Sequence, residues 1–96
     1  MGCVFSDLSS DLQVMTLDDN GNLAIQPNDF VEGKRVNGLG AGASAWIGCK
    51  DGSDIALDGQ RLRANTFAYK YTCPSEDELT EVYMYVDIGE RLSCLN

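Results

Sequence analysis

The chain has no histidine, so the commonest general base and metal ligand is missing from its 96 residues. Nucleophile activation of the Ser-His or Cys-His kind is therefore excluded. None of the four cysteines forms a C-x-x-C pair, so neither a zinc knuckle nor a thioredoxin-like site is expected. No pair of carboxylates stands out for acid–base work. We expect a protein that is not an enzyme and that uses no cofactor and no metal.

Basic residues and long apolar runs are scarce as well. Seven lysines and arginines face fifteen acidic residues, for a net charge of −8. A surface this acidic repels phosphate groups, so we expect neither nucleic acid nor an anionic membrane as a partner. No apolar run approaches the ~18 residues that would suggest a membrane span. Length and composition indicate one globular domain, residues 1–96.

The cysteines stand at positions 3, 49, 73 and 94. An even number at long spacings suits two structural disulfides in an oxidising compartment, and hence a secreted protein. Three pairings are open, and the sequence does not choose among them. We favour Cys3–Cys94, which would tie the termini, with Cys49–Cys73 nested inside.

The first residues, MGCVFS, have two interpretations. Gly2 with Ser6 matches an N-myristoylation signal with Cys3 as a palmitoylation site, which would place an adaptor on the inner face of a membrane. One myristoyl chain needs a second signal, and no basic residue precedes Lys34. We therefore interpret Met1 and Gly2 as residues added to a processed secreted chain and Cys3 as a half-cystine. The acylated adaptor remains an alternative.

Asn-Gly and Asp-Gly dipeptides are the clearest local signal, at 20–21, 37–38, 51–52 and 58–59. Both residue types tolerate the positive φ of tight turns, so each pair predicts a hairpin. Strands are expected at 12–17, 22–26, 45–50, 53–57 and 60–64. The first two should pair with each other, and 45–50 should turn through Asp51-Gly52 into 53–57.

Two later segments alternate as half-buried strands do. Segment 66–73 places Phe67, Tyr69, Tyr71 and Cys73 on one face, and segment 81–88 places Tyr83 and Tyr85 opposite its apolar residues. Gly89-Glu90 would turn the latter into a strand at 91–95, and only 74–79 looks helical. The sum predicts an all-β fold: a small β-sandwich or barrel of six to eight short antiparallel strands, with at most one short helical turn near 74–79 and two disulfides.

Exposed aromatic side chains on a rigid sheet are good contact residues for a protein or a sugar. The candidate binding surface comprises Trp46, Tyr83 and Tyr85, together with the basic residues Arg61 and Arg63. The structural alternative for the aromatics is packing within a two-sided core. We expect a binding protein whose partner is another protein, with a glycan as the second class of ligand.

Two resemblances bear on the partner. A small acidic chain with an early cysteine, short strands and two disulfides resembles the secreted β-sandwich effectors and toxins of plant-pathogenic fungi, those of the MAX (ToxB-like) kind nearest. That resemblance implies secretion and action by binding a host protein. NGNLAIQPNDF, residues 20–30, is similar to a segment of cyanovirin-type lectin repeats, which implies a small carbohydrate-binding lectin as the alternative. The tandem repeat of that family does not recur, so no sugar-binding residue is carried over.

Overall fold

The computed structural model describes residues 1–5, 8–27, 29–31, 34–63 and 67–95. These residues contain eleven short strands and one 3-10 helix, joined by turns and loops. The expected all-β class is confirmed. There are more strands than expected because many of them are only two to four residues long. The elements are β1 (Gly2–Phe5), β2 (Leu12–Leu17), β3 (Leu23–Ile25), β4 (Asp29–Val31), β5 (Lys34–Gly40), β6 (Ser44–Cys49), β7 (Asp54–Leu57), β8 (Gln60–Arg61), β9 (Ala68–Thr72), β10 (Tyr83–Val86), η1 (Ile88–Arg91) and β11 (Leu92–Leu95).

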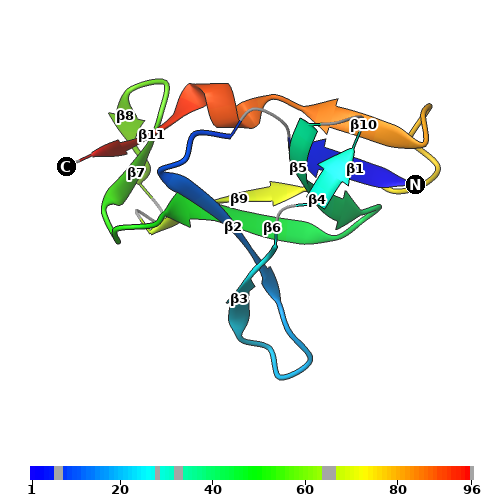
Figure 1. The fold of residues 1–96 in the computed structure, drawn as a ribbon, viewed down its shortest axis with the longest axis horizontal. Helices are drawn as coiled ribbons and strands as arrows, with labels where there is room; N and C mark the ends of the chain where they lie inside the picture. Colours follow the sequence, from blue (N-terminus) through cyan, green and yellow to red (C-terminus); the bar gives the residue numbers. More distant parts are fainter. Residues whose placement is uncertain (6–7, 28, 32–33, 64–66, 96) are drawn as a thin grey trace.

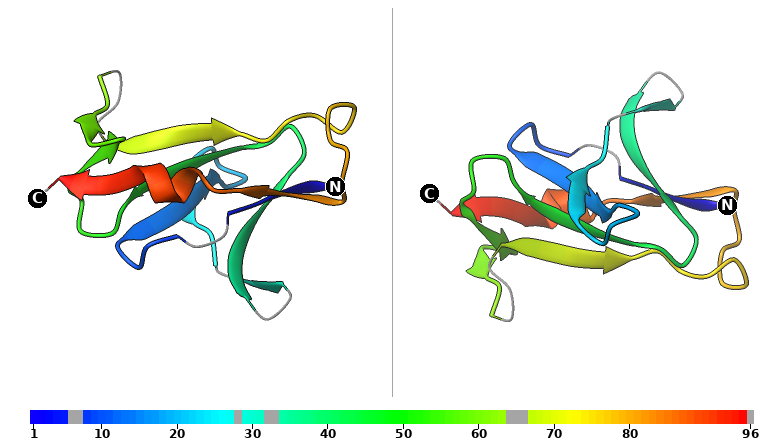
Figure 2. Two further views of the ribbon diagram at one scale, coloured as in Figure 1. Left: turned by 90° about the horizontal axis from the view of Figure 1, so that it is seen from above. Right: turned by 90° about the horizontal axis from the view of Figure 1, so that it is seen from below.

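The strands form three sheets, which we name by position. The central sheet has the order β3-β2-β6-β9, the N-terminal sheet β10-β1-β5-β4 and the C-terminal sheet β11-β7-β8. In Figure 1 the two end sheets lie at opposite ends of the long axis, and β6 and β9 run between them. The views from above and below show the same lengthwise course of these two strands (Figure 2). Neighbouring strands are antiparallel, except that β1 and β10 are parallel.

Each sheet contributes a fully buried side chain to one shared core. Phe5 comes from the N-terminal sheet, Ile47 from the central sheet and Ile55 from the C-terminal sheet. The ring of Phe5 meets Tyr71 edge to face, with centroids 5.4 Å apart. A single hydrophobic cluster therefore holds the three sheets together as one unit.

The Asx-Gly dipeptides do not all make hairpins. Asn20-Gly21 closes the β2–β3 hairpin, and Asp58-Gly59 closes β7–β8 with φ values of 53° and 83°, as a type I′ turn requires. Asp51-Gly52 does turn the chain, but β6 and β7 then enter different sheets, so the expected hairpin is wrong. Asn37-Gly38 lies inside β5, because pairing with Val4 and Phe5 of β1 keeps the backbone extended there.

The disulfides join Cys3 to Cys73 and Cys49 to Cys94, so the favoured pairing is wrong. Cys3 lies in β1 and Cys94 in β11, toward opposite ends of a molecule 36 Å long (Figure 1). A disulfide requires Cα atoms within about 7 Å of each other, which these two cannot satisfy. In the observed pairs the Cα atoms are 5.9 and 6.0 Å apart.

The helical turn is not where it was expected, and the segment after β10 does not form a hairpin. A hydrogen-bonded turn forms near 74–79, where the Leu79 N–H donates to Ser75 O, but the 3-10 helix is η1. Gly89 has no room for a Cβ, which would collide with the Leu8 side chain. The chain makes a helical turn at 88–91 where a hairpin was expected, and β11 pairs with β7 in the C-terminal sheet and not with β10.

Candidate binding site

The β2–β3 hairpin is the part of the central sheet that extends beyond β6. β2 pairs with β6 through Leu12–Met15, but from Met15 to Leu17 its described strand partner is β3. The hairpin therefore projects from the body of the molecule, as Figure 1 shows.

A shallow groove of about 400 Å³ lies where the end of β2 meets the outer face of β6 and β9 and the end of β5. We call it the hairpin groove; it is lined by Thr16, Leu17, Leu39, Ala43, Ser44, Trp46 and Lys70. Its volume falls within the range of small-ligand sites, roughly 300–1,000 Å³. Four of the seven lining residues are apolar, and Lys70 is the only charged one.

Trp46 and Lys70 are cross-strand neighbours on the outer face of the central sheet, the face away from the core. The Lys70 ammonium lies 5.4 Å from the centroid of the Trp46 ring. This distance is within the range of a cation–π interaction. Pairing places Ser44 beside Thr72 on the same face, where their hydroxyl oxygens are 2.8 Å apart.

Three aliphatic side chains continue this face along the hairpin. Strand pairing puts Leu17 opposite Leu23, and Ile25 opposite Met15, which is the cross-strand neighbour of Trp46. Leu17, Leu23 and Ile25 are 56%, 39% and 65% exposed. We call these three residues with Trp46 and Lys70 the hairpin face. Apolar residues clustered on one projecting element are typical of interaction surfaces.

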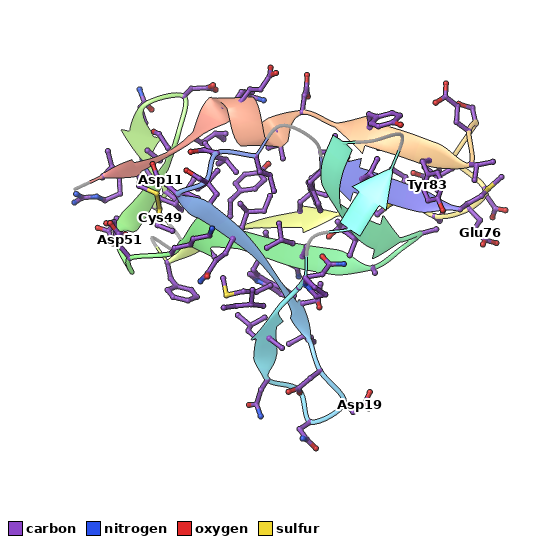
Figure 3. All side chains as sticks on the ribbon, in the orientation of Figure 1. Asp11, Asp19, Cys49, Asp51, Glu76 and Tyr83 are labelled. Atoms are coloured by element: carbon purple, nitrogen blue, oxygen red, sulfur yellow. A yellow bond between two sulfur atoms is a disulfide. The ribbon has the colours of Figure 1, made fainter. Side chains whose placement is uncertain are left out.

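The tip of the hairpin is acidic. The Asp18 carboxylate accepts hydrogen bonds from the backbone N–H groups of Asn20 and Asn22, each at 2.9 Å, and so stabilises the turn. The neighbouring Asp19 is exposed at the tip, as Figure 3 shows. The hairpin face thus has a cation at its β9 end and a carboxylate at its hairpin end.

The five residues of the predicted surface are not brought together. Trp46 lies in the hairpin face, whereas Tyr83 and Tyr85 are exposed on β10 of the N-terminal sheet. Arg61 pairs with Asp54 at 3.2 Å in the C-terminal sheet, and Arg63 is exposed beyond β8. Sequence reasoning missed Leu17, Leu23, Ile25 and Lys70. For the three aliphatic residues the available signal was that the second strand of the predicted hairpin, 22–26, has no charged residue. No local signal places Lys70 beside Trp46.

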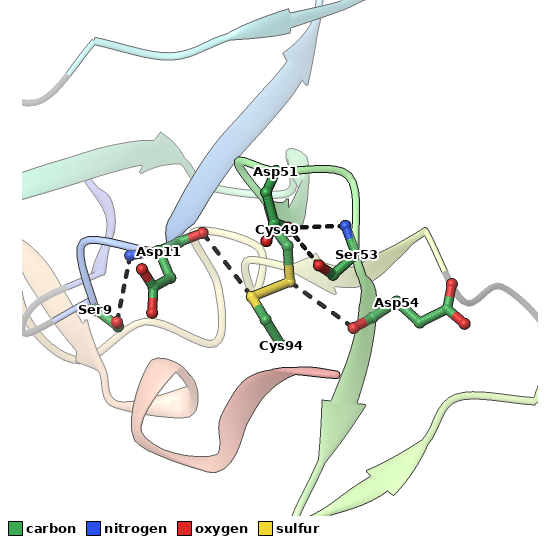
Figure 4. The surroundings of a disulfide bond; sticks show 7 residues. All are labelled: Ser9, Asp11, Cys49, Asp51, Ser53, Asp54 and Cys94. Carbon is green, nitrogen blue, oxygen red and sulfur yellow. Dashed lines mark hydrogen bonds between the residues drawn. A yellow bond between two sulfur atoms is a disulfide. The ribbon is translucent and has the colours of Figure 1, made fainter. Parts of the chain in front are cut away.

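A second, more polar groove of about 270 Å³ borders the Cys49–Cys94 disulfide, and its lining includes Ser9, Asp11 and Asp51. Figure 4 shows that Asp11 takes part through its backbone, whose N–H donates to the Ser9 hydroxyl, whereas Asp51 takes part through its carboxylate. The hydroxyl and the backbone N–H of Ser53 donate to the Asp51 carboxylate at 2.5 and 2.8 Å, and these hydrogen bonds lower the pKa of Asp51. A carboxylate held ionised in this way has no proton to donate near neutral pH, so it is unsuited to general acid catalysis.

No metal site, membrane-spanning helix or known relative adds to what the described residues show. In the described ranges, no three acidic or cysteine side chains are placed to bind a metal ion. None of the helices there has the length and apolar character to cross a membrane. No family model matches the chain, and comparisons with curated proteins and solved structures found no similar protein.

Proposed function

We propose that this protein is secreted and acts without catalysis, by binding a protein partner through the hairpin face. The observation that carries the proposal is the exposure of Leu17, Leu23 and Ile25 beside Trp46 on one projecting element. The core does not need these side chains, because the buried cluster is complete without them. Apolar area left in water on a small domain favours association with a partner.

Two disulfides support an extracellular location, where such bonds persist. They also weaken the acylated-adaptor alternative. Cys3 is bonded to Cys73, so in this state its sulfur cannot accept a palmitoyl group. The resemblance to secreted fungal effectors makes a host protein the partner that we expect.

The hairpin face suits a protein better than a sugar. Lys70 lies over the ring of Trp46, and the adjoining side chains are aliphatic, whereas sugars need many hydrogen-bonding groups. The glycan alternative rests on residues 20–30, which include Leu23 and Ile25 of the hairpin face, and on the exposed aromatic residues, of which Tyr83 and Tyr85 lie on a separate surface. A glycan array probed with the protein and with Tyr83→Ala/Tyr85→Ala tests it: binding that depends on the two tyrosines would favour a lectin.

A displayed library of random peptides, panned against the folded protein, tests the proposal. We expect enriched peptides to bind Leu23→Ser/Ile25→Ser at least about tenfold more weakly than the unaltered protein, because truncating central apolar contacts costs upward of about 1 kcal/mol each. Tyr83→Ser/Tyr85→Ser is the matched control on another sheet and should bind normally. Equal loss in the two variants, or none in either, would contradict the proposal.

A further inference from the structure

We infer that the hairpin face recognises an extended protein segment with a carboxylate at one end, apolar side chains in the middle and a basic side chain at the other end. This inference rests on the proposed function and specifies the chemistry of its partner. It is drawn from the distribution of charge across the face.

Lys70 differs from the paired arginines. Among the described residues, Arg61 and Arg91 form ion pairs with Asp54 and Asp58, while the contact of Lys70 is the Trp46 ring. Lys70 is therefore a cation beside an apolar groove, in a protein with more than twice as many acids as bases. An incoming carboxylate would gain an ion pair there without displacing an existing one from the described part of the chain.

Asp19 provides the opposite charge at the far end. The carboxylate of Asp18 is occupied by backbone N–H groups, but that of Asp19 extends from the tip of the hairpin (Figure 3). Between Lys70 and Asp19 the face consists of Trp46 and the aliphatic residues of the hairpin. The order across the face is cation, apolar, anion.

Strand spacing sets the length of the segment. From β9 to β3 there are three inter-strand steps, roughly 14 Å in total at about 4.8 Å each. An extended chain advances about 3.3 Å per residue, so about five residues span from Lys70 to β3, and one or two more, as a rough estimate, extend toward the hairpin tip. Such a segment can direct alternate apolar side chains onto the face.

Charge also argues against a second copy as the occupant. Each copy carries a net charge of −8, so two copies repel each other at low ionic strength. A partner that is less acidic avoids this cost, and its basic group would meet the acidic tip. We therefore assign the face to a different protein.

Charge exchange tests the inference. One peptide of the expected pattern, taken from the panned library, is titrated against the protein and its variants by calorimetry. Lys70→Glu should weaken binding about tenfold, and a peptide with its acid replaced by lysine should restore it. Asp19→Lys should behave likewise toward a peptide with its base replaced by glutamate. The losses should shrink in 0.5 M salt, because the Debye length falls to about 4 Å.

Lys50→Glu is the matched control, an exposed lysine just beyond the other end of β6. If Lys70→Glu weakens binding no more than Lys50→Glu, or if neither peptide exchange restores affinity, the inference is overturned. If the charge variants bind normally but Leu23→Ser/Ile25→Ser abolishes binding, the inference fails and the proposed function stands. If Leu23→Ser/Ile25→Ser also binds normally, the inference and the proposed function both fail. Circular dichroism spectra should be unchanged in all these variants, since the altered side chains are exposed.

Discussion

Asp58 is the one non-glycine residue with positive φ in the described ranges. Its carboxylate accepts hydrogen bonds from Arg91 Nε and an Arg91 terminal nitrogen, at 3.0 and 2.5 Å, and this pair lowers the pKa of Asp58. One side chain thus tolerates the turn conformation and joins β7–β8 to the end of η1. Because the Asp58–Arg91 ion pair is exposed, we expect it to contribute only modestly to the free energy of unfolding.

Asp58→Asn should lower the free energy of unfolding at pH 7. Asparagine also tolerates positive φ, so the change removes the charge and keeps the turn. The native pKa of Asp58 is depressed, so its contribution is complete above the unfolded value of about 3.9 and disappears as pH falls through the native value. The difference from the unaltered protein should therefore be largest near neutral pH and vanish in strong acid.

Urea unfolding at pH 7 and near pH 2 measures this difference. Glu76→Gln is the control, an exposed acid toward the other end of the molecule (Figure 3). A loss of equal size at the two pH values would mean that the turn, and not the charge, is what the substitution disturbs.

At the scale of elements, the β2–β3 hairpin differs from the rest of the central sheet. The inward side chains of β2 and β6, such as Val14 and Ile47, are buried, whereas all three residues of β3 are exposed. β3 therefore adds little to the core, and its sequence is free to serve a partner. An apolar, uncharged strand at the end of a sheet also risks aggregation, which its short length limits.

Replacing two isoleucines by alanine, one in β6 and one in β3, should separate residues that stabilise the core from residues free to contact a partner. Ile47→Ala, at a side chain with 0% exposure, should lower the free energy of unfolding by about 3–4 kcal/mol through lost burial and the cavity left behind. Ile25→Ala, at 65% exposure, should change it by less than about 0.5 kcal/mol. Chemical denaturation measures both variants. A large loss at Ile25 would show that the hairpin packs against the body in solution.

At the scale of the whole molecule, each disulfide joins the central sheet to a different end sheet. Cys73 follows β9 and is bonded to β1, and Cys49 ends β6 and is bonded to β11. The bridges close chain segments with sequence separations of 70 and 45 residues. By the loop-entropy model each stabilises the fold by about 4 kcal/mol, a large share of a small domain's stability of about 5–15 kcal/mol.

Tryptic digestion without reductant checks the pairing, because lysines and arginines separate all four cysteines. We expect the peptide 1–34 to be linked to 71–91, and 36–50 to be linked to 92–96. A link between 1–34 and 92–96 would contradict the structure, and four free thiols in protein from an oxidising host would contradict secretion as well.

The two bridges should also differ in how fast they are reduced. Cys3 and Cys73 are buried at 0% and 1% exposure, whereas Cys94 lines the polar groove shown in Figure 4. Access governs thiol–disulfide exchange, so dilute dithiothreitol should open Cys49–Cys94 first. Alkylation during partial reduction, followed by mass mapping, should label Cys49 and Cys94 before the other pair. The reverse order would contradict the burial of the first bridge.

Local signals predicted the elements better than their pairing. The Asn20-Gly21 turn signal placed strand 12–17 at its observed limits, and Asp58-Gly59 made the expected turn. Alternation correctly placed Tyr83 and Tyr85 on the exposed side of their strand. These features depend on residues within one strand or turn. The parallel pairing of β1 with β10 depends on residues some eighty positions apart, and no local pattern encodes it.

The site was predictable only at Trp46. A tryptophan in a strand is a good candidate for contact with a partner. The residues around it in the sequence do not show which aliphatic side chains lie beside it on the surface. Leu17, Leu23 and Ile25 look like core residues in the sequence and become surface residues because β2 leaves β6 at Met15. Lys70 joins them because β9 pairs with β6 in a register that faces it to Trp46.

By itself the sequence determined the all-β class, the short strands, two of the hairpin turns and the acidity of the surface, since each follows from residue types and their local order. Only the tertiary structure decided which cysteines meet, which strands share a sheet and which apolar side chains remain in water. The physical reason is that these outcomes depend on contacts between distant segments. Such contacts form when one arrangement buries Phe5, Ile47 and Ile55 together, and that arrangement leaves the hairpin outside.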